Sequence, residues 1–309
     1  MNYHFLYFDH IQLNINPNKI KKITKYTLKK FGSIYWHIQA GKTVFPVQMA
    51  VKLHIPLIIW GAHQGIDQVG MFSHHEEIEM TRKYRKEHDL LGYEAEDLIL
   101  KNHNLNEDDL SSYFYPDDIK ISKNGIRGIY LNNYIRWDTK KQHEKMIRNY
   151  NYKTLKQLRT FDNYNDVHCK HYSGLHDYIK YLKLGYGCTT DHATREIRLK
   201  RITRNQGINL VNKYSNSFPI DLKNFSYWIK MNSKQIIEII EKFRNKEIWK
   251  KNKNGKWELK NKLSKKNLNH KIQLIQNNKN VLKFISNPSS YSKNNNENLL
   301  LSRGFIEKS

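Results

Sequence analysis

The segment from Leu184 to Gly207, LGYGCTTDHATREIRLKRITRNQG, combines residue types that bind phosphate or carboxylate groups. Two glycines flank an aromatic residue, and charged side chains follow at helical spacing. Guanidinium groups donate paired hydrogen bonds to oxyanions, and the first turn of a helix favours an anion. The segment therefore predicts a site for a phosphate-bearing ligand, formed by Tyr186, Asp191, His192, Arg195, Arg198 and Arg201.

Two short helices are expected within this segment. Asp191 is a residue type that often serves as an N-cap, so the first helix is predicted to begin there and to run to Arg201. Thr203 and Gln206 have the spacing of a capping box, which predicts the start of a second helix. For His192, a capping or packing role remains the alternative to a role in binding or acid–base chemistry.

A second candidate site follows the apolar run IPLIIWG at residues 55–61. A continuous apolar run of this length predicts a strand buried on both faces of a parallel sheet. Ligands of such sheets bind at the carboxyl ends of the strands, where GAHQGIDQVG begins. Gly61, His63 and Asp67 are the candidate ligand-binding residues, and an ordinary turn with capping side chains is the alternative.

The remaining elements follow from periodicity and from capping residues. Residues 17–31 and 44–54 predict helices, residues 3–9 and 124–138 predict strands, and Gly92 separates two further helices. Asp138 is expected to cap the helix that follows it, and residues 153–183 are expected to be mainly helical. The Asn-Gly pair in 251–260 predicts a hairpin, before an Asn/Lys-rich tail that is expected to be loosely ordered.

The composition limits the class of protein. The formal charge of +24 attracts phosphates, although a Lys-, Asn- and Ile-rich composition is also typical of an AT-rich genome. Two cysteines, Cys169 and Cys188, exclude a disulfide framework. The sequence has no apolar run long enough to span a bilayer and no signal-peptide pattern, so a cytoplasmic protein without a membrane partner is expected.

Several stretches together resemble the N-acetyl sugar amidotransferases of the PP-loop ATPase superfamily, which act in surface-sugar biosynthesis. The resemblance covers residues 5–260, and its most specific part is the block 176–214. The other matching pieces are FDHIQLNINP (8–17), FGSIYWHIQAG (31–41), IPLIIWGAHQGIDQVGMFS (55–73), GIRGIYLNNYIRWD (125–138) and EIWKKNKNGKW (247–257).

The resemblance implies a reaction in which ATP, with Mg²⁺, adenylates the amide oxygen of an N-acetyl group. Ammonia from a glutaminase subunit then displaces AMP and leaves an acetamidino group. The implied substrate is a sugar or sugar nucleotide of lipopolysaccharide, pseudaminic acid or flagellin glycosylation. Gly61, His63 and Asp67 would then bind the nucleotide, and the surface from Tyr186 to Arg204 would bind phosphates of the sugar nucleotide or ATP.

The resemblance also implies an α/β fold. The expected architecture is an incomplete Rossmann-like parallel sheet of the PP-loop (adenine nucleotide alpha hydrolase) type, followed by a mostly helical carboxyl region. The predicted boundaries are 1–75 for the α/β part, 76–260 for the helical region and 261–309 for the tail.

One expected motif is missing, because no Ser-Gly-Gly sequence occurs in the 309 residues. The family's ATP loop, S-G-G-x-D-S, is therefore absent, and an amino-terminally truncated chain is expected. Either a separate polypeptide supplies this loop, or the chain is a non-catalytic remnant. Both alternatives stay open at this point.

Two rival classes have weaker support. His168, Cys169, His171, His176, Cys188 and His192 do not have the spacing of a zinc site, so no metal is predicted. A helix-turn-helix formed around Thr203 would explain the arginines and the charge. It would not explain the Gly-Tyr-Gly segment or the Asp191–His192 pair, so nucleic acid is a less favoured partner.

Overall fold

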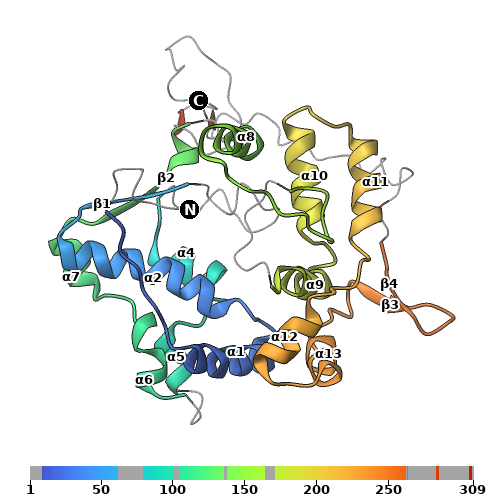
Figure 1. Cartoon of the computed structure of the whole chain (residues 1–309), viewed down its shortest axis with the longest axis horizontal. Helices are drawn as coiled ribbons and strands as arrows, with labels where there is room; N and C mark the ends of the chain where they lie inside the picture. Colours follow the sequence, from blue (N-terminus) through green and yellow to red (C-terminus); the bar gives the residue numbers. More distant parts are fainter. Residues whose placement is uncertain are drawn as a thin grey trace.

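The computed structural model describes residues 9–61, 79–100, 105–135, 138–163, 171–261, 263, 283–284 and 306–307. Helices dominate these parts of the chain (Figure 1). The helices of the amino-terminal half are α1 (Pro17–Phe31), α2 (Trp36–Leu53), α4 (Arg82–Tyr84), the π-helix η2 (Arg85–Asp89), α5 (Ala95–Leu100), α6 (Glu107–Leu110), the 3₁₀-helix η3 (Ser111–Tyr113), α7 (Asp118–Lys123), the 3₁₀-helix η4 (Leu131–Asn133) and α8 (Thr139–Tyr150). The carboxyl half contains α9 (Ser173–Leu184), α10 (Cys188–Arg198), α11 (Arg204–Tyr214), α12 (Leu222–Ile229) and α13 (Ser233–Glu241).

The first predicted helix is confirmed with both of its end signals. The Asn16 side chain accepts a hydrogen bond from the Asn18 amide, and Pro17 takes the first helical position. Gly32 ends α1 in the left-handed conformation. The second helix, α2, begins at Trp36, earlier than predicted, because its buried face already starts at that side chain and continues through Ala40.

Two strands, β1 (Leu57–Trp60) and β2 (Arg127–Tyr130), pair in parallel, with Leu57 opposite Arg127. A strand was predicted at each place, but the second is shorter than the predicted 124–138, because the 3₁₀-helix η4 begins at Leu131. The predicted burial of β1 on both faces was wrong. Leu57 is 45% exposed and Ile59 is 59% exposed, because nothing in the described residues covers that face. The described residues thus show a mixed α/β chain that is mainly helical, with a small parallel sheet.

The described residues between the two strands, 79–100 and 105–126, contact α2 and β2. Gly92, at a φ of +84°, separates the helical turn ending at Asp89 from α5, as predicted. Arg85 is buried and donates to Glu94, with 2.7 Å between Arg85 Nη1 and Glu94 Oε1. Arg85 Nε also donates to Thr43 Oγ1 of α2 at 2.9 Å, and the Trp36 indole donates to the Tyr93 carbonyl. These two hydrogen bonds hold the segment against α2.

The carboxyl half contains predicted and unpredicted features. The capping box of Thr203 and Gln206 and the Asp138 cap of α8 are both confirmed. Residues 151–163 are irregular and not helical as predicted, while most of the predicted strand at 3–9 lies outside the described residues. The predicted hairpin consists of β3 (Trp249–Lys251) and β4 (Trp257–Leu259), and a further strand pair joins β5 (Lys283–Phe284) and β6 (Ile306–Glu307).

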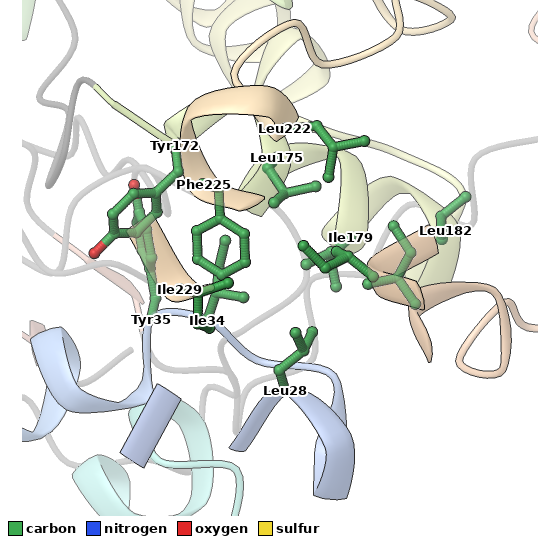
Figure 2. Close-up of a cluster of buried hydrophobic side chains, with 12 residues drawn as sticks. Leu28, Ile34, Tyr35, Tyr172, Leu175, Ile179, Leu182, Leu222, Phe225 and Ile229 are labelled. Atoms are coloured by element: carbon green, nitrogen blue, oxygen red, sulfur yellow. The ribbon is translucent and has the colours of Figure 1, made fainter. Parts of the chain in front are cut away.

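One hydrophobic cluster joins segments from both halves of the chain (Figure 2). Leu28 of α1 and Ile34 pack with Leu175 of α9 and with Phe225 and Ile229 of α12. A second cluster, around Trp36, Leu90 and Tyr113, packs α2 against the segment between the strands. The region that carries the predicted ligand site therefore rests directly on the amino-terminal helices. Among the described residues, none of the helices has the length and apolar character needed to cross a bilayer.

Candidate substrate site

The loop between α9 and α10 is a tight turn that depends on its two glycines. Gly185 ends α9 with a φ of +76°, and a Cβ added there would lie 2.7 Å from Ile248 Cγ2. Gly187 has extended backbone, and an added Cβ would lie 2.8 Å from the Asp177 carboxylate oxygens. The structure thus places Tyr186 next to the start of α10, as expected from the sequence.

The amino-terminal end of α10 is occupied by a carboxylate of the chain itself. Asp177 Oδ1 accepts a hydrogen bond from the Cys188 amide at 2.6 Å. Asp191 is not the N-cap that the sequence predicted, because the extended Gly187 starts the helix one turn earlier. The Asp177 carboxylate therefore already occupies the position at the helix terminus that would attract an anion.

Arg159 organises this corner of the molecule. Its side chain is 3% exposed, and its Nε donates to Asp177 Oδ2 at 2.7 Å. It also donates to the carbonyl oxygens of Ser215 and Ser217, while its own carbonyl accepts a hydrogen bond from the Thr189 hydroxyl. These contacts fasten the irregular segment before α9 to α9, to α10 and to the end of α11.

Sequence reasoning missed Arg159. It lies in a segment that was predicted to be helical, and its partner Asp177 is 18 residues away. No local spacing signals such a contact, because both residues become neighbours only when the irregular segment packs on α9.

Tyr186 is half-buried and lies beside the ion pair of Lys180 and Asp191. Lys180 Nζ lies 5.0 Å from the centre of the Tyr186 ring and 2.5 Å from Asp191 Oδ2. Burial alone would lower the pKa of Lys180, but the Asp191 carboxylate raises it above its ordinary value. Burial raises the pKa of the Tyr186 phenol. Lys180 therefore stays charged beneath the Tyr186 ring, as one half of an ion pair.

His192 is buried behind this group. Its Nδ1 lies 2.6 Å from the Thr160 hydroxyl, and the Phe161 ring meets it edge-on. Burial lowers the pKa of His192 to about 4, so the imidazole is neutral at pH 7. These contacts are those of a packed, hydrogen-bonded histidine.

Arg195 and Arg201, two of the predicted phosphate-binding residues, form ion pairs with carboxylates of the chain. Arg195 is 7% exposed and donates to Asp162 and Glu196. Arg201 is paired with Glu196 and with Asp138, the cap of α8. The two guanidinium groups thus connect α10 to the end of the irregular segment and to α8.

This pairing weakens a helix-turn-helix interpretation, because two of its arginines are committed to internal carboxylates. Arg198 is half-buried, and it also has an interaction within the chain. Gly207 of α11 packs against Ile197 of α10, so that the two helices lie side by side (Figure 1).

The second predicted site is described only in part. Gly61 follows β1, and its carbonyl accepts a hydrogen bond from the Asn132 amide at 3.2 Å. His63 and Asp67 lie outside the described residues. The carboxyl ends of β1 and β2 meet at this point, but the predicted ligand contacts at His63 and Asp67 remain a prediction.

A metal centre has no support in the described part of the chain, which contains no cluster of three His, Cys, Asp or Glu residues that could hold an ion. His168 and Cys169 lie outside that part. The Cys188 thiol is largely enclosed, and burial raises its pKa well above the ordinary value.

Part of the chain, including the α9–α10 loop, matches a known protein family. Residues 158–264 match the family model described as LPS biosynthesis protein WbpG-like, C-terminal domain. These residues resemble a domain of lipopolysaccharide-biosynthesis proteins. The match spans roughly a third of the chain, starts beside Arg159 and includes the complete α9–α10 loop. A comparison with curated proteins finds no match for the chain. The family match supports a role in LPS biosynthesis.

Proposed function

We propose that the chain acts in LPS biosynthesis as part of an ATP-dependent N-acetyl sugar amidotransferase, with residues 176–201 contributing to its sugar site. One observation carries this proposal. The segment similar to the WbpG-like C-terminal domain contains the α9–α10 loop, and a buried polar network fixes that loop. The proposed substrate is a nonulosonate or nucleotide-sugar precursor of a surface glycan.

The proposed reaction balances in two steps. The amide oxygen of the N-acetyl group attacks the α-phosphorus of ATP, bound with Mg²⁺, and pyrophosphate leaves. Ammonia then adds to the activated carbon, which loses a proton and AMP and becomes an acetamidino carbon. Catalysis of both steps depends on positioning and on stabilising negative charge on phosphate oxygens.

In this proposal Tyr186 is the residue that contacts the sugar. Its half-buried ring offers an apolar face and a hydroxyl, and the Lys180–Asp191 pair supports it from below. Asp177 and the internal ion pairs of Arg195 and Arg201 hold the α9–α10 loop and helix α10 in position. These three groups act as positioning residues.

The nucleotide is proposed to bind at the other predicted site, with Gly61, His63 and Asp67 at the carboxyl end of β1. A glutaminase subunit is the proposed source of ammonia. A polypeptide with an S-G-G-x-D-S loop is a further proposed partner, because this chain has no Ser-Gly-Gly sequence. Backbone amides of such a loop would bind the pyrophosphate of ATP.

The experiment that tests the proposal starts with binding of UDP- and CMP-linked N-acetyl sugars to the whole chain, measured by calorimetry. Tyr186→Ala is expected to weaken binding at least about tenfold, by removing one aromatic contact. Tyr150→Ala on α8, where the tyrosine is 47% exposed, is the matched control and is expected to bind like the wild type.

The second stage adds ATP, Mg²⁺ and ammonium, with and without the glutaminase and the loop-bearing polypeptide. AMP release that requires the N-acetyl sugar is the expected result. If sugar nucleotides bind neither to the chain nor to the assembled mixture, the proposed substrate class is wrong.

A further inference from the structure

Helix α12 has a buried face and an exposed face of unusual composition. Leu222, Phe225 and Ile229 point into the hydrophobic cluster, where they are at most 7% exposed (Figure 2). Asp221 holds the start of the helix in place, because its carboxylate accepts hydrogen bonds from the amides of Gly174 and Leu175. The helix is therefore fixed, and its outer face has a defined orientation.

The outer face combines apolar and cationic side chains. Tyr227 is 88% exposed and Ile220 is 73% exposed, the two largest values among the exposed large hydrophobic residues of the described chain. Lys223 and Lys230 are exposed too. Lys223 and Tyr227 are four residues apart within α12 and share one side of the helix, while Ile220 lies just before its N-cap and Lys230 is its C-cap. Phe218, which is 55% exposed, lies just before them. We call these five residues the α12 patch.

Acidic residues are scarce in the sequence around this patch. The single acidic residue between positions 212 and 237 is Asp221, which is half-buried and bonded to α9. Solvation of a surface helix does not require an isoleucine and a tyrosine at its most exposed positions. A surface with lysines beside aromatic and aliphatic side chains has a composition that binds the interface of an anionic lipid bilayer.

We propose that the α12 patch docks the protein on an anionic phospholipid surface, with Ile220 and Tyr227 at the level of the headgroups and Lys223 and Lys230 beside the lipid phosphates. No membrane partner was expected, because the sequence has no apolar run long enough to span a bilayer. Such a run is needed to cross a bilayer but not to dock on its surface. The inference goes beyond the proposed function and does not depend on it.

The test is sedimentation of the full chain with phosphatidylcholine vesicles that do or do not contain phosphatidylglycerol. The patch variant is Ile220→Ser/Lys223→Gln. The control variant is Ile119→Ser/Lys120→Gln on α7, where Ile119 is 64% exposed and Lys120 is also exposed. Helix α7 lies at the left of the view in Figure 1, well apart from α12. Both variants lose one isoleucine and one charge, and both retain the basic tail.

The wild type is expected to bind anionic vesicles better than neutral ones. Binding should weaken between about 0.05 M and about 0.5 M salt, because salt screens the lysines. The patch variant is expected to lose at least about tenfold in partition coefficient, while the control variant loses much less. Unfolding midpoints and circular dichroism check that both variants fold.

Three results would overturn the proposal. One is a wild type that does not bind anionic vesicles. Another is an equal loss in the two variants, which would reflect net charge alone. The third is binding of the wild type to duplex DNA but not to vesicles, with loss in the patch variant, which would assign the patch to nucleic acid.

Discussion

Arg159 and Asp177 form a buried ion pair, with 2.7 Å between Arg159 Nε and Asp177 Oδ2, and the same carboxylate caps helix α10 through the Cys188 amide. One aspartate thus links an irregular segment, α9 and α10. The orientation of Tyr186, which lies between the last two elements, depends on this link.

Replacing Arg159 with methionine should destabilise the protein strongly. The change leaves the Asp177 carboxylate buried without its cation, and breaking such a pair costs about 3–5 kcal/mol. Urea unfolding measures the difference. Arg148→Met on α8, where the arginine is exposed, is the control and should change the free energy of unfolding by less than about 0.5 kcal/mol. Equal effects of the two substitutions would show that the pair does not stabilise the fold.

Gly185→Ala is expected to be more harmful than Gly125→Ala, although both glycines have positive φ angles, +76° and +59°. An alanine at Gly125 meets open space and bears only the backbone penalty of about 1 kcal/mol. An alanine at Gly185 must also displace Ile248, which adds about 1–3 kcal/mol. Thermal unfolding of the two variants compares these values directly, and a similar loss in both would rule out a steric role for Ile248.

Stability should fall as the solution is acidified from pH 6.5 towards pH 4. Burial lowers the pKa of His37 and of His192 from 6.5 to about 4 in the folded state. Within this window the unfolded chain binds more protons than the folded chain, so the free energy of unfolding falls as the pH is lowered. Each histidine contributes up to about 3 kcal/mol to this loss.

His192→Gln removes one of these titrations while keeping a hydrogen-bonding group for Thr160. The variant should therefore show a shallower dependence of unfolding free energy on pH, measured by urea unfolding at several pH values. A slope as steep as that of the wild type would mean that His192 is accessible to protons in the folded state.

Salt should have little effect on the proposed binding of a nucleotide sugar. Arg195 and Arg201 are already neutralised by carboxylates of the chain, so few counterions are displaced when a ligand with two phosphates binds. Calorimetry at low and high salt checks this expectation. A steep loss of affinity with salt would instead indicate the many phosphate contacts of a nucleic-acid surface.

Local signals predicted the parts of the fold that depend on neighbouring residues. The Thr203–Gln206 capping box, the Gly32 stop of α1 and the Asn-Gly hairpin are set within a few residues, and each was found in place. Asp191 shows the limit of such signals. It has the right type for an N-cap, but Asp177, from the preceding helix, supplies the cap instead.

The sequence indicated which segment contains the candidate site, but not how its side chains are arranged. Clustered arginines indicated an anion site, yet the partners of Arg195 and Arg201 are carboxylates from distant positions, Asp162 and Asp138. A sequence shows which charges are present, whereas tertiary packing decides whether they face a ligand or one another. The exposed face of β1 escaped prediction for a similar reason, since burial of a strand depends on elements outside the run itself.

The shared hydrophobic cluster has a consequence for synthesis of the chain on the ribosome. Leu28 of α1 packs with Ile236 and Ile240 of α13, which are translated about 200 residues later. At typical elongation rates, α1 leaves the ribosome about 10–40 s before these partners exist. Its apolar face must remain exposed, or be held by a chaperone, during that interval. Nascent chains stopped before α12 should therefore be more sensitive to protease at α1 than the completed protein.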